Sequence, residues 1–236
     1  MKVAAVVAHP DDIELLCAGT MIKYINKGHK VTYIIATNGE AGSQTLSNEE
    51  IAKIRYQEAI DSAKIVGADL IWLGYKDEFL FNTAEVRLSF LNALRKAEAE
   101  VVFTHYPDYY NCDHNAVSII TNEVGILQNV KNIKTEYPPT PENPYLYFMD
   151  TICCKGFEPE EFVDITDVIE IKKKALLIHK SQCLWLKGHS KIDYLDMMIT
   201  QSKIRGYQSG VEYAEAFIGV KTFPRVISKS LLPQYL

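Results

Sequence analysis

VAAVVAHPDD, residues 3–12, is the most informative segment of this 236-residue chain for predicting its fold. Its first six residues form a continuous apolar run, which is typical of a strand that is buried on both faces of a parallel sheet. The run stops at His9, and two adjacent aspartates, Asp11 and Asp12, follow Pro10. Burying two carboxylates at the end of a strand destabilises the folded state unless a bound cation stabilises them. Their presence therefore suggests a bound cation or a role in catalysis. The stretch therefore predicts a strand whose end is a candidate site.

Outward from this stretch, strand and helix patterns alternate through the first half of the chain. Residues 13–27 have helical spacing and precede Gly28, a residue typical of helix C-termini. Ser47 and Glu50 form a capping box for a second helix. This alternation predicts an α/β fold, in which right-handed βαβ units build a mainly parallel sheet with helices on both faces. Three more strands are predicted at KVTYIIAT (30–37), DLIWLG (69–74) and VVFTH (101–105), and further helices from about residues 83 and 113.

The second half of the chain has a less regular pattern. The segment YPPTPENP (137–144) predicts a surface loop. A helical pattern over 167–186 predicts one long helix, and a second helix is expected over 192–206. No internal repeat or change of composition marks a boundary, so we expect one domain over residues 1–236. Two more strands are predicted at YLYFM (145–149) and FVDI (162–165).

Composition and charge argue against several classes of protein. The net charge is −5 and no block of Lys or Arg stands out, which argues against a nucleic-acid partner or an anionic membrane surface. No apolar run is long enough to predict a membrane span, and the N-terminal run is too short for a signal peptide. The five cysteines lack C-x-x-C spacing, which argues against a zinc site built from thiolates. We therefore expect a cytoplasmic protein.

Two clusters of metal-ligand side chains are expected to meet at one edge of the sheet. The first follows the strand at residues 3–8, and the second, HYPDYYNCDH (105–114), follows the strand at 101–105. In a doubly wound sheet of strand order 3-2-1-4-5 these two strands are neighbours, and ligands bind beyond their carboxyl ends. The topology therefore predicts a site between the two loops.

His9, Asp12 and His114 are a suitable ligand set for a catalytic zinc ion, because two imidazoles and one carboxylate leave a position open for water. Neighbouring residues on an extended loop point in different directions, so Asp11 can face that water without binding the metal. We expect Asp11 to act as the general base. The same ligands also bind Fe²⁺ and other divalent ions, so the identity of the metal stays open.

The segment AHPDDIELLCAGT (8–20) resembles the signature of the PIG-L/LmbE-like zinc-dependent N-deacetylases. This resemblance implies a Rossmann-like α/β domain with Zn²⁺ at His9, Asp12 and His114, and Asp11 as the base. The usual reaction of the family removes the acetyl group from an N-acetylglucosamine-type amino-sugar conjugate, through attack by a zinc-activated water. The resemblance continues along the chain in TNGEAGS (37–43), IRYQEAIDSAKIVGAD (54–69), DHNAV (113–117), KKKALLIHKSQ (172–182) and EYAEAFIGV (212–220).

The resemblance also suggests residues around the substrate. Arg55 and Asp77 are expected to contact the sugar, and His179, in an H-x-S-Q stretch, is expected at the rim of the pocket. Asn111 stands where the family often has a histidine that stabilises the oxyanion. An amide NH₂ can donate a hydrogen bond there but cannot carry a proton, so we expect Asn111 to be a catalytic donor. Relatives are often symmetric oligomers, so a homo-oligomer is possible.

Other functions stay open at this point. The same site could hydrolyse a different amide, or the chain could be a catalytically weakened carbohydrate-binding relative. Non-haem iron oxygenases use similar ligands, but usually on all-β folds, whereas this chain alternates strand and helix. A dinucleotide site is disfavoured, because the first strand–helix turn, HPDDIE (9–14), lacks a G-x-G-x-x-G motif.

Overall fold

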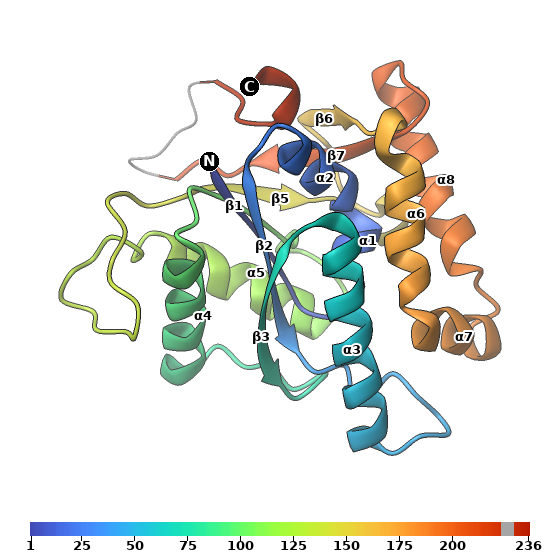
Figure 1. The fold of residues 1–236 in the computed structure, drawn as a ribbon, viewed down its shortest axis with the longest axis horizontal. Helices are drawn as coiled ribbons and strands as arrows, with labels where there is room; N and C mark the ends of the chain where they lie inside the picture. Colours follow the sequence, from blue (N-terminus) through green and yellow to red (C-terminus); the bar gives the residue numbers. More distant parts are fainter. Residues whose placement is uncertain (223–228) are drawn as a thin grey trace.

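A seven-stranded mixed sheet crosses the structure in the order β3-β2-β1-β4-β5-β7-β6 (Figure 1). The computed structural model describes residues 1–222 and 229–236. The first five strands are parallel to one another, and β7 is antiparallel to both β5 and β6. The strands are β1 (Lys2–Val7), β2 (Lys30–Thr37), β3 (Asp69–Tyr75), β4 (Val101–Thr104), β5 (Tyr145–Met149), β6 (Glu161–Asp164) and β7 (Ala214–Gly219).

Helices cover both faces of this sheet, with α4 and α5 on one face and α1, α2, α3 and α6 on the other (Figure 1). The described residues contain no helix that is long and apolar enough to cross a membrane. The α-helices are α1 (Asp12–Leu16), α2 (Ala18–Asn26), α3 (Asn48–Val66), α4 (Ala84–Ala97), α5 (Cys112–Gly125), α6 (Ile169–Ile178), α7 (Lys180–His189) and α8 (Tyr194–Ser209), and short 3₁₀ turns lie at Ile152–Cys154, Thr166–Val168 and Pro233–Tyr235.

Strand β1 lies at the centre of the sheet and contributes side chains to two hydrophobic cores. Val3, Ala5 and Val7 pack into the core on the α1–α3 side, whereas the alternate residues of the strand pack into the core under α4 and α5. Successive side chains of a strand point to opposite faces, so a strand with a core on each face must be apolar at every position. The predicted α/β fold with a mainly parallel sheet and strand order 3-2-1-4-5 is confirmed.

The prediction of one helix over 13–27 is wrong, because two helices meet at Cys17. The second helix begins where the backbone N–H groups of Gly19 and Thr20 donate to the Glu215 carboxylate, at 2.8 and 2.7 Å. A carboxylate at a helix N-terminus satisfies free N–H groups and is favoured by the helix dipole. Position 19 must be glycine, because a Cβ there would lie 2.7 Å from Ile165 Cγ2.

The prediction of one helix over 167–186 is also wrong, because α6 ends at Ile178 and α7 begins at Lys180. His179 forms the junction, with φ −74° and ψ 58°. Asp167 does not cap α6, and its carboxylate pairs instead with Lys23 at 2.8 Å. In the same half of the chain, β7 was not predicted as a strand. Its pairing with β5 and β6 completes the sheet on that side.

Candidate metal centre and active site

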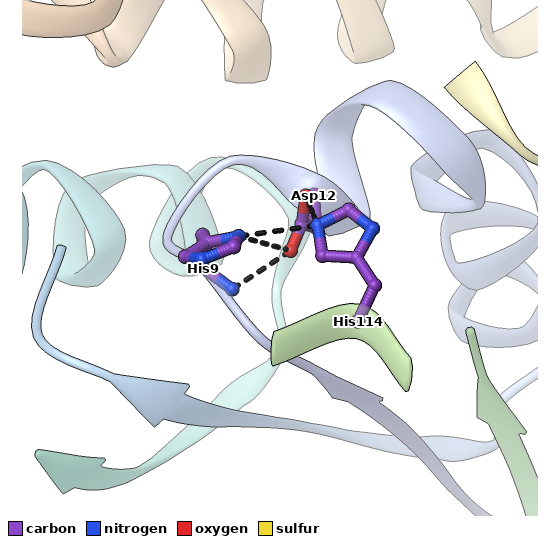
Figure 2. Close-up of side chains that lie close together, drawn as sticks. All are labelled: His9, Asp12 and His114. Atoms are coloured by element: carbon purple, nitrogen blue, oxygen red, sulfur yellow. Dashed lines mark hydrogen bonds and ion pairs between the residues drawn. The ribbon is translucent and has the colours of Figure 1, made fainter. Parts of the chain in front are cut away.

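Three side chains converge beyond the carboxyl ends of β1 and β4, as Figure 2 shows for His9, Asp12 and His114. His9 follows β1, Asp12 is the first residue of α1, and His114 lies in the first turn of α5. The Nδ1 atom of His9 lies 3.1 Å from Nε2 of His114. The Asp12 carboxylate lies 3.4 Å from His9 Nδ1 through one oxygen and 3.3 Å from His114 Nε2 through the other.

These distances fit a single tetrahedral ion. Two ligand atoms bound about 2.0–2.1 Å from zinc at the tetrahedral angle lie about 3.3–3.4 Å apart. The three side chains also offer ligand atoms that all lie within 4.8 Å of one another. Two imidazoles and one carboxylate suit zinc and leave one coordination position open. A divalent cation therefore fits between His9, Asp12 and His114.

A second set of possible ligands shares one of these histidines. His9, Asp77 and Glu78 also have ligand atoms within 4.8 Å of one another. This set has one imidazole and two carboxylates, and Glu78 is exposed to solvent. Zinc sites in proteins are richer in nitrogen or sulfur ligands, so the first set is the better zinc site.

Asp77 lies behind His9, on the side away from the candidate metal. The Oδ1 atom of Asp77 is 3.1 Å from His9 Nε2, and neither atom has a well-aligned hydrogen bond to another group. Asp113 also approaches His9 Nε2, at 3.6 Å. A carboxylate that accepts from the outer nitrogen of a ligand histidine fixes its tautomer and its orientation. Asp77 therefore has the position of a partner of His9 rather than that of a free sugar contact.

His105, which the sequence reasoning did not assign, supports two of the ligands. Its ring stacks on the ring of His114 with a centroid distance of 3.9 Å. Its Nε2 accepts a hydrogen bond from the backbone N–H of Ala8 at 3.0 Å and lies 3.3 Å from Asp12 Oδ2. The sequence could have indicated this role, because His105 comes directly after β4, at the same edge of the sheet as His9.

The electrostatics of the cluster favour a bound cation. Burial lowers the pKa of His9, but the carboxylates of Asp113, Asp12 and Asp77 outweigh burial and raise that pKa well above its ordinary value. Burial alone would raise the pKa of Asp12, but His114 and His105 bring it well below its ordinary value. Three buried carboxylates thus surround one imidazole, and a metal ion would supply the positive charge that they attract.

Asp11 does not belong to the ligand triangle and is held by Arg55. The Nη2 atom of Arg55 donates to Asp11 Oδ1 at 3.3 Å and to the carbonyl oxygen of Pro10 at 2.8 Å, and Nη1 donates to Gly39 O at 3.1 Å. Arg55 is only 4% exposed, so its guanidinium is a buried part of the site. Burial raises the pKa of Asp11 to about 6, and Arg55 opposes this rise. A carboxylate of this kind suits general-base chemistry near neutrality.

Asn111 has a structural role that the sequence did not reveal. Its side-chain oxygen accepts from the backbone N–H of His114 at 3.0 Å, so Asn111 is the N-cap of α5. Its Nδ2 donates to Glu78 Oε1 at 3.3 Å. The cap sets the start of the helix that carries a metal ligand. Among the described residues, Glu78 is the one acceptor found for this amide, so its second N–H bond has no hydrogen-bond partner.

His179 does not lie at the rim of a pocket, so that prediction is wrong. Its ring is 1% exposed, and its Nε2 lies 3.3 Å from Glu14 Oε2. Burial lowers the pKa of His179, but Glu14 outweighs burial and raises it. His179 likewise lowers the pKa of Glu14, which burial alone would raise. The two side chains therefore form a buried ion pair.

The site has little open space around it. A crevice too narrow to admit a water molecule adjoins His114 and is lined in part by Tyr109, Leu16 and Ile152. Tyr110 is 77% exposed in the same loop as Tyr109. A larger hollow of about 560 Å³ lies at the opposite edge of the sheet, where β1, β4 and β5 begin, and none of the metal-ligand residues lines it.

Comparison with protein families matches residues 4–124 to the family described as PIG-L, GlcNAc-PI de-N-acetylase. The matched part covers more than half of the chain and includes the three ligand residues and Asp11. This chain belongs to the PIG-L family.

Two proteins similar to this chain are deacetylases by name. The chain is 30% identical to the diacetylchitobiose deacetylase of Thermococcus kodakarensis over 193 residues, which cover 77% of this chain and 70% of that protein. The structure of the N,N'-diacetylchitobiose deacetylase from Pyrococcus horikoshii matches 92% of this chain and 83% of that chain, with a TM-score of 0.79 and 28% identity.

A second similar structure shows that this fold is not confined to one reaction. The 4-carboxy-2-hydroxymuconate hydratase from Pseudomonas putida matches 98% of this chain and all of that chain, with a TM-score of 0.79 and 22% identity. Fold likeness at this level of identity is shared by proteins with different chemistry. The geometry of the site and the deacetylases of higher identity are therefore the evidence that bears on the reaction.

Proposed function

We propose that this protein is a metal-dependent hydrolase that removes the N-acetyl group from an N-acetylglucosamine-type amino-sugar conjugate. The observation that carries the proposal is the pairing of the His9, Asp12 and His114 triangle with Asp11, a carboxylate in the same turn that lies outside the triangle. A site that only binds sugar needs no such base. The deacetylase relatives support the same reaction.

The ligand set would hold Zn²⁺, or another divalent ion such as Fe²⁺. When bound, the ion would lower the pKa of a water molecule to about 7 and polarise the amide carbonyl. Asp77 and His105 orient the ligand side chains through their contacts with His9, His114 and Asp12. These supporting contacts reduce the freedom of the ligands before the substrate arrives.

Asp11 would accept a proton from the attacking water and pass it to the leaving amine. The C–O bond to the acetyl carbon forms first, and the C–N bond breaks afterwards, so the products are acetate and the free amino sugar. Protonation of the nitrogen avoids the expulsion of an amide anion. Arg55 keeps the Asp11 carboxylate in place through its hydrogen bonds to Asp11, Pro10 and Gly39.

Asn111 would stabilise the oxyanion with the N–H bond that Glu78 does not use. A donor of this kind acts mainly in the transition state, where negative charge develops on the carbonyl oxygen. Arg55 is buried and bonded to Asp11, and Asp77 is buried beside His9. Direct contacts of these two side chains with the sugar remain predictions. Tyr110 is exposed beside Asn111 and is a candidate ring for packing against the sugar.

Acetate release tests the proposal. The purified protein is freed of metal, reloaded with Zn²⁺ or Fe²⁺, and assayed against a panel of N-acetylglucosaminides that includes N,N'-diacetylchitobiose. We expect metal-dependent release of acetate, and loss of most of it in Asp11→Asn. Cleavage of other amides without cleavage of the sugars would show an amidase instead. Sugar binding without any hydrolysis would show a carbohydrate-binding relative.

A further inference from the structure

The break between α6 and α7 places His179 inside the molecule, although the sequence over 167–186 contains neither glycine nor proline. A break in a sequence that is able to form one helix gives up helical hydrogen bonds, and tertiary contacts must offset that loss. The residues that follow the break, Ser181 and Gln182, make such contacts. The junction thus has a task beyond connecting two helices.

Three inward contacts leave this junction. His179 reaches Glu14 of α1 at 3.3 Å. Ser181 donates to Glu58 of α3 through its backbone N–H at 2.9 Å and through its hydroxyl at 2.6 Å. Gln182 donates to the carbonyl oxygen of Gly42 at 3.2 Å. The junction therefore binds the helix that follows Asp11, the helix that carries Arg55, and the loop after β2.

Glu14 connects the junction to the candidate base. It lies on α1, a helix of five residues that begins directly after Asp11. Asp11 has φ 118°, a left-handed conformation that strains a residue other than glycine. A helix of one turn does not hold such a residue by itself. Glu14 is 2% exposed and also accepts the Ser62 hydroxyl at 2.6 Å, so α1 is fixed between α3 and the junction.

We propose that His179 is a positioning residue: through Glu14 it fixes the strained turn that presents Asp11 to the substrate. The proposal rests on the proposed function in so far as Asp11 is the base. His179 does not touch the substrate, since its ring is buried behind α1. Its effect on turnover comes from the geometry of Asp11, and misplacement of a reacting group by about 1 Å costs about 100-fold in rate.

His179→Gln tests the proposal, with Ser181→Ala as a matched control. The control removes the hydroxyl contact to Glu58 in the same junction and leaves Glu14 untouched. We expect His179→Gln to lower kcat about 10- to 100-fold, with KM and zinc content close to those of the parent. We also expect faster amide hydrogen exchange over residues 11–16 in this variant. In Ser181→Ala, kcat should stay within about twofold and exchange over 11–16 should not change.

Glu14→Gln provides a second variant if His179→Gln folds poorly. It should lower kcat to a similar extent, and the double variant should be no slower than the slower single one, because both changes break the same link. Effects that multiply would overturn the proposal, as would parental kcat in His179→Gln or an equal loss in Ser181→Ala. If the parent releases no acetate, the proposed function fails, and hydrogen exchange over 11–16 still decides whether His179 positions this turn.

Discussion

Replacing Asp77 tests whether this residue supports a metal ligand or binds the sugar. Its Oδ1 lies 3.1 Å from His9 Nε2, and its Oδ2 accepts the backbone N–H of Ala41 at 3.0 Å. Asp77→Asn keeps the shape of the side chain and an acceptor oxygen but removes the charge. Asp77→Ala removes the partner of His9 altogether. We expect both variants to bind zinc more weakly, and the alanine variant more weakly than the asparagine variant.

The size of the effect follows from the burial of the pair. Loss of a carboxylate that orients a ligand histidine typically weakens metal binding 10- to 100-fold. Asp77 is 5% exposed, so water does not readily replace its carboxylate. We therefore expect about 10-fold for Asp77→Asn and about 100-fold for Asp77→Ala. These factors correspond to about 1.4 and 2.7 kcal/mol of binding free energy.

The assay titrates the metal-free protein with Zn²⁺ against a chromophoric competing chelator. Asp69→Asn is the matched control, because Asp69 is an exposed aspartate at the start of β3, the strand that leads to Asp77. Turnover is then measured at saturating zinc, where KM should stay within about twofold of the parent. Parental zinc affinity in Asp77→Ala together with a KM raised 10-fold or more would contradict a role in metal binding and indicate a sugar contact instead.

Four further outcomes are expected. Asp11→Ala should retain zinc, measured by elemental analysis, but lose about 10²–10⁴-fold in kcat, and parental turnover would make Asp11 a structural residue. His114→Ala should lose zinc and activity while circular dichroism shows a folded protein, and zinc content equal to that of the parent would contradict the assigned ligand set. Asn111→Ser keeps an N-cap but lacks the amide donor, so kcat should fall about 10²–10³-fold with little change in the melting temperature, and parental kcat would remove Asn111 from the mechanism. Because its folded-state pKa is raised, His179 should stabilise the protein fully below its unfolded pKa of about 6.5 and lose this effect as the pH rises through the folded pKa. Urea unfolding should therefore show a larger cost of His179→Gln at pH 6 than at pH 9, and an equal cost at both would contradict a charged pair with Glu14.

Local patterns in the sequence were sufficient for the central part of the fold. The unbroken apolar run of β1, the strands that follow it and the capping box at Ser47 and Glu50 all appear in the structure. These signals depend on neighbours within a few residues, which the chain order itself supplies. The rule that ligands bind at the carboxyl ends of strands where the order reverses then brought His9 and His114 to one place.

The same local patterns predicted uninterrupted helices where the structure has breaks. At Cys17 the cause is Glu215, which lies 196 positions away from Gly19 along the chain. At His179 the cause is a set of partners on α1, α3 and the loop after β2. Helical periodicity depends on residues only a few positions apart. The patterns within 13–27 and 167–186 therefore could not reveal either break.

Sequence patterns were sufficient to select the candidate residues, which are two histidines and two aspartates at the ends of neighbouring parallel strands. Only the tertiary structure decided what the surrounding residues do. It turned Asp77 toward His9, capped α5 with Asn111 and buried His179 beside Glu14. The physical reason is that a side chain's role depends on which partner satisfies it once water is removed, and these partners meet only when the sheet and its helices have packed.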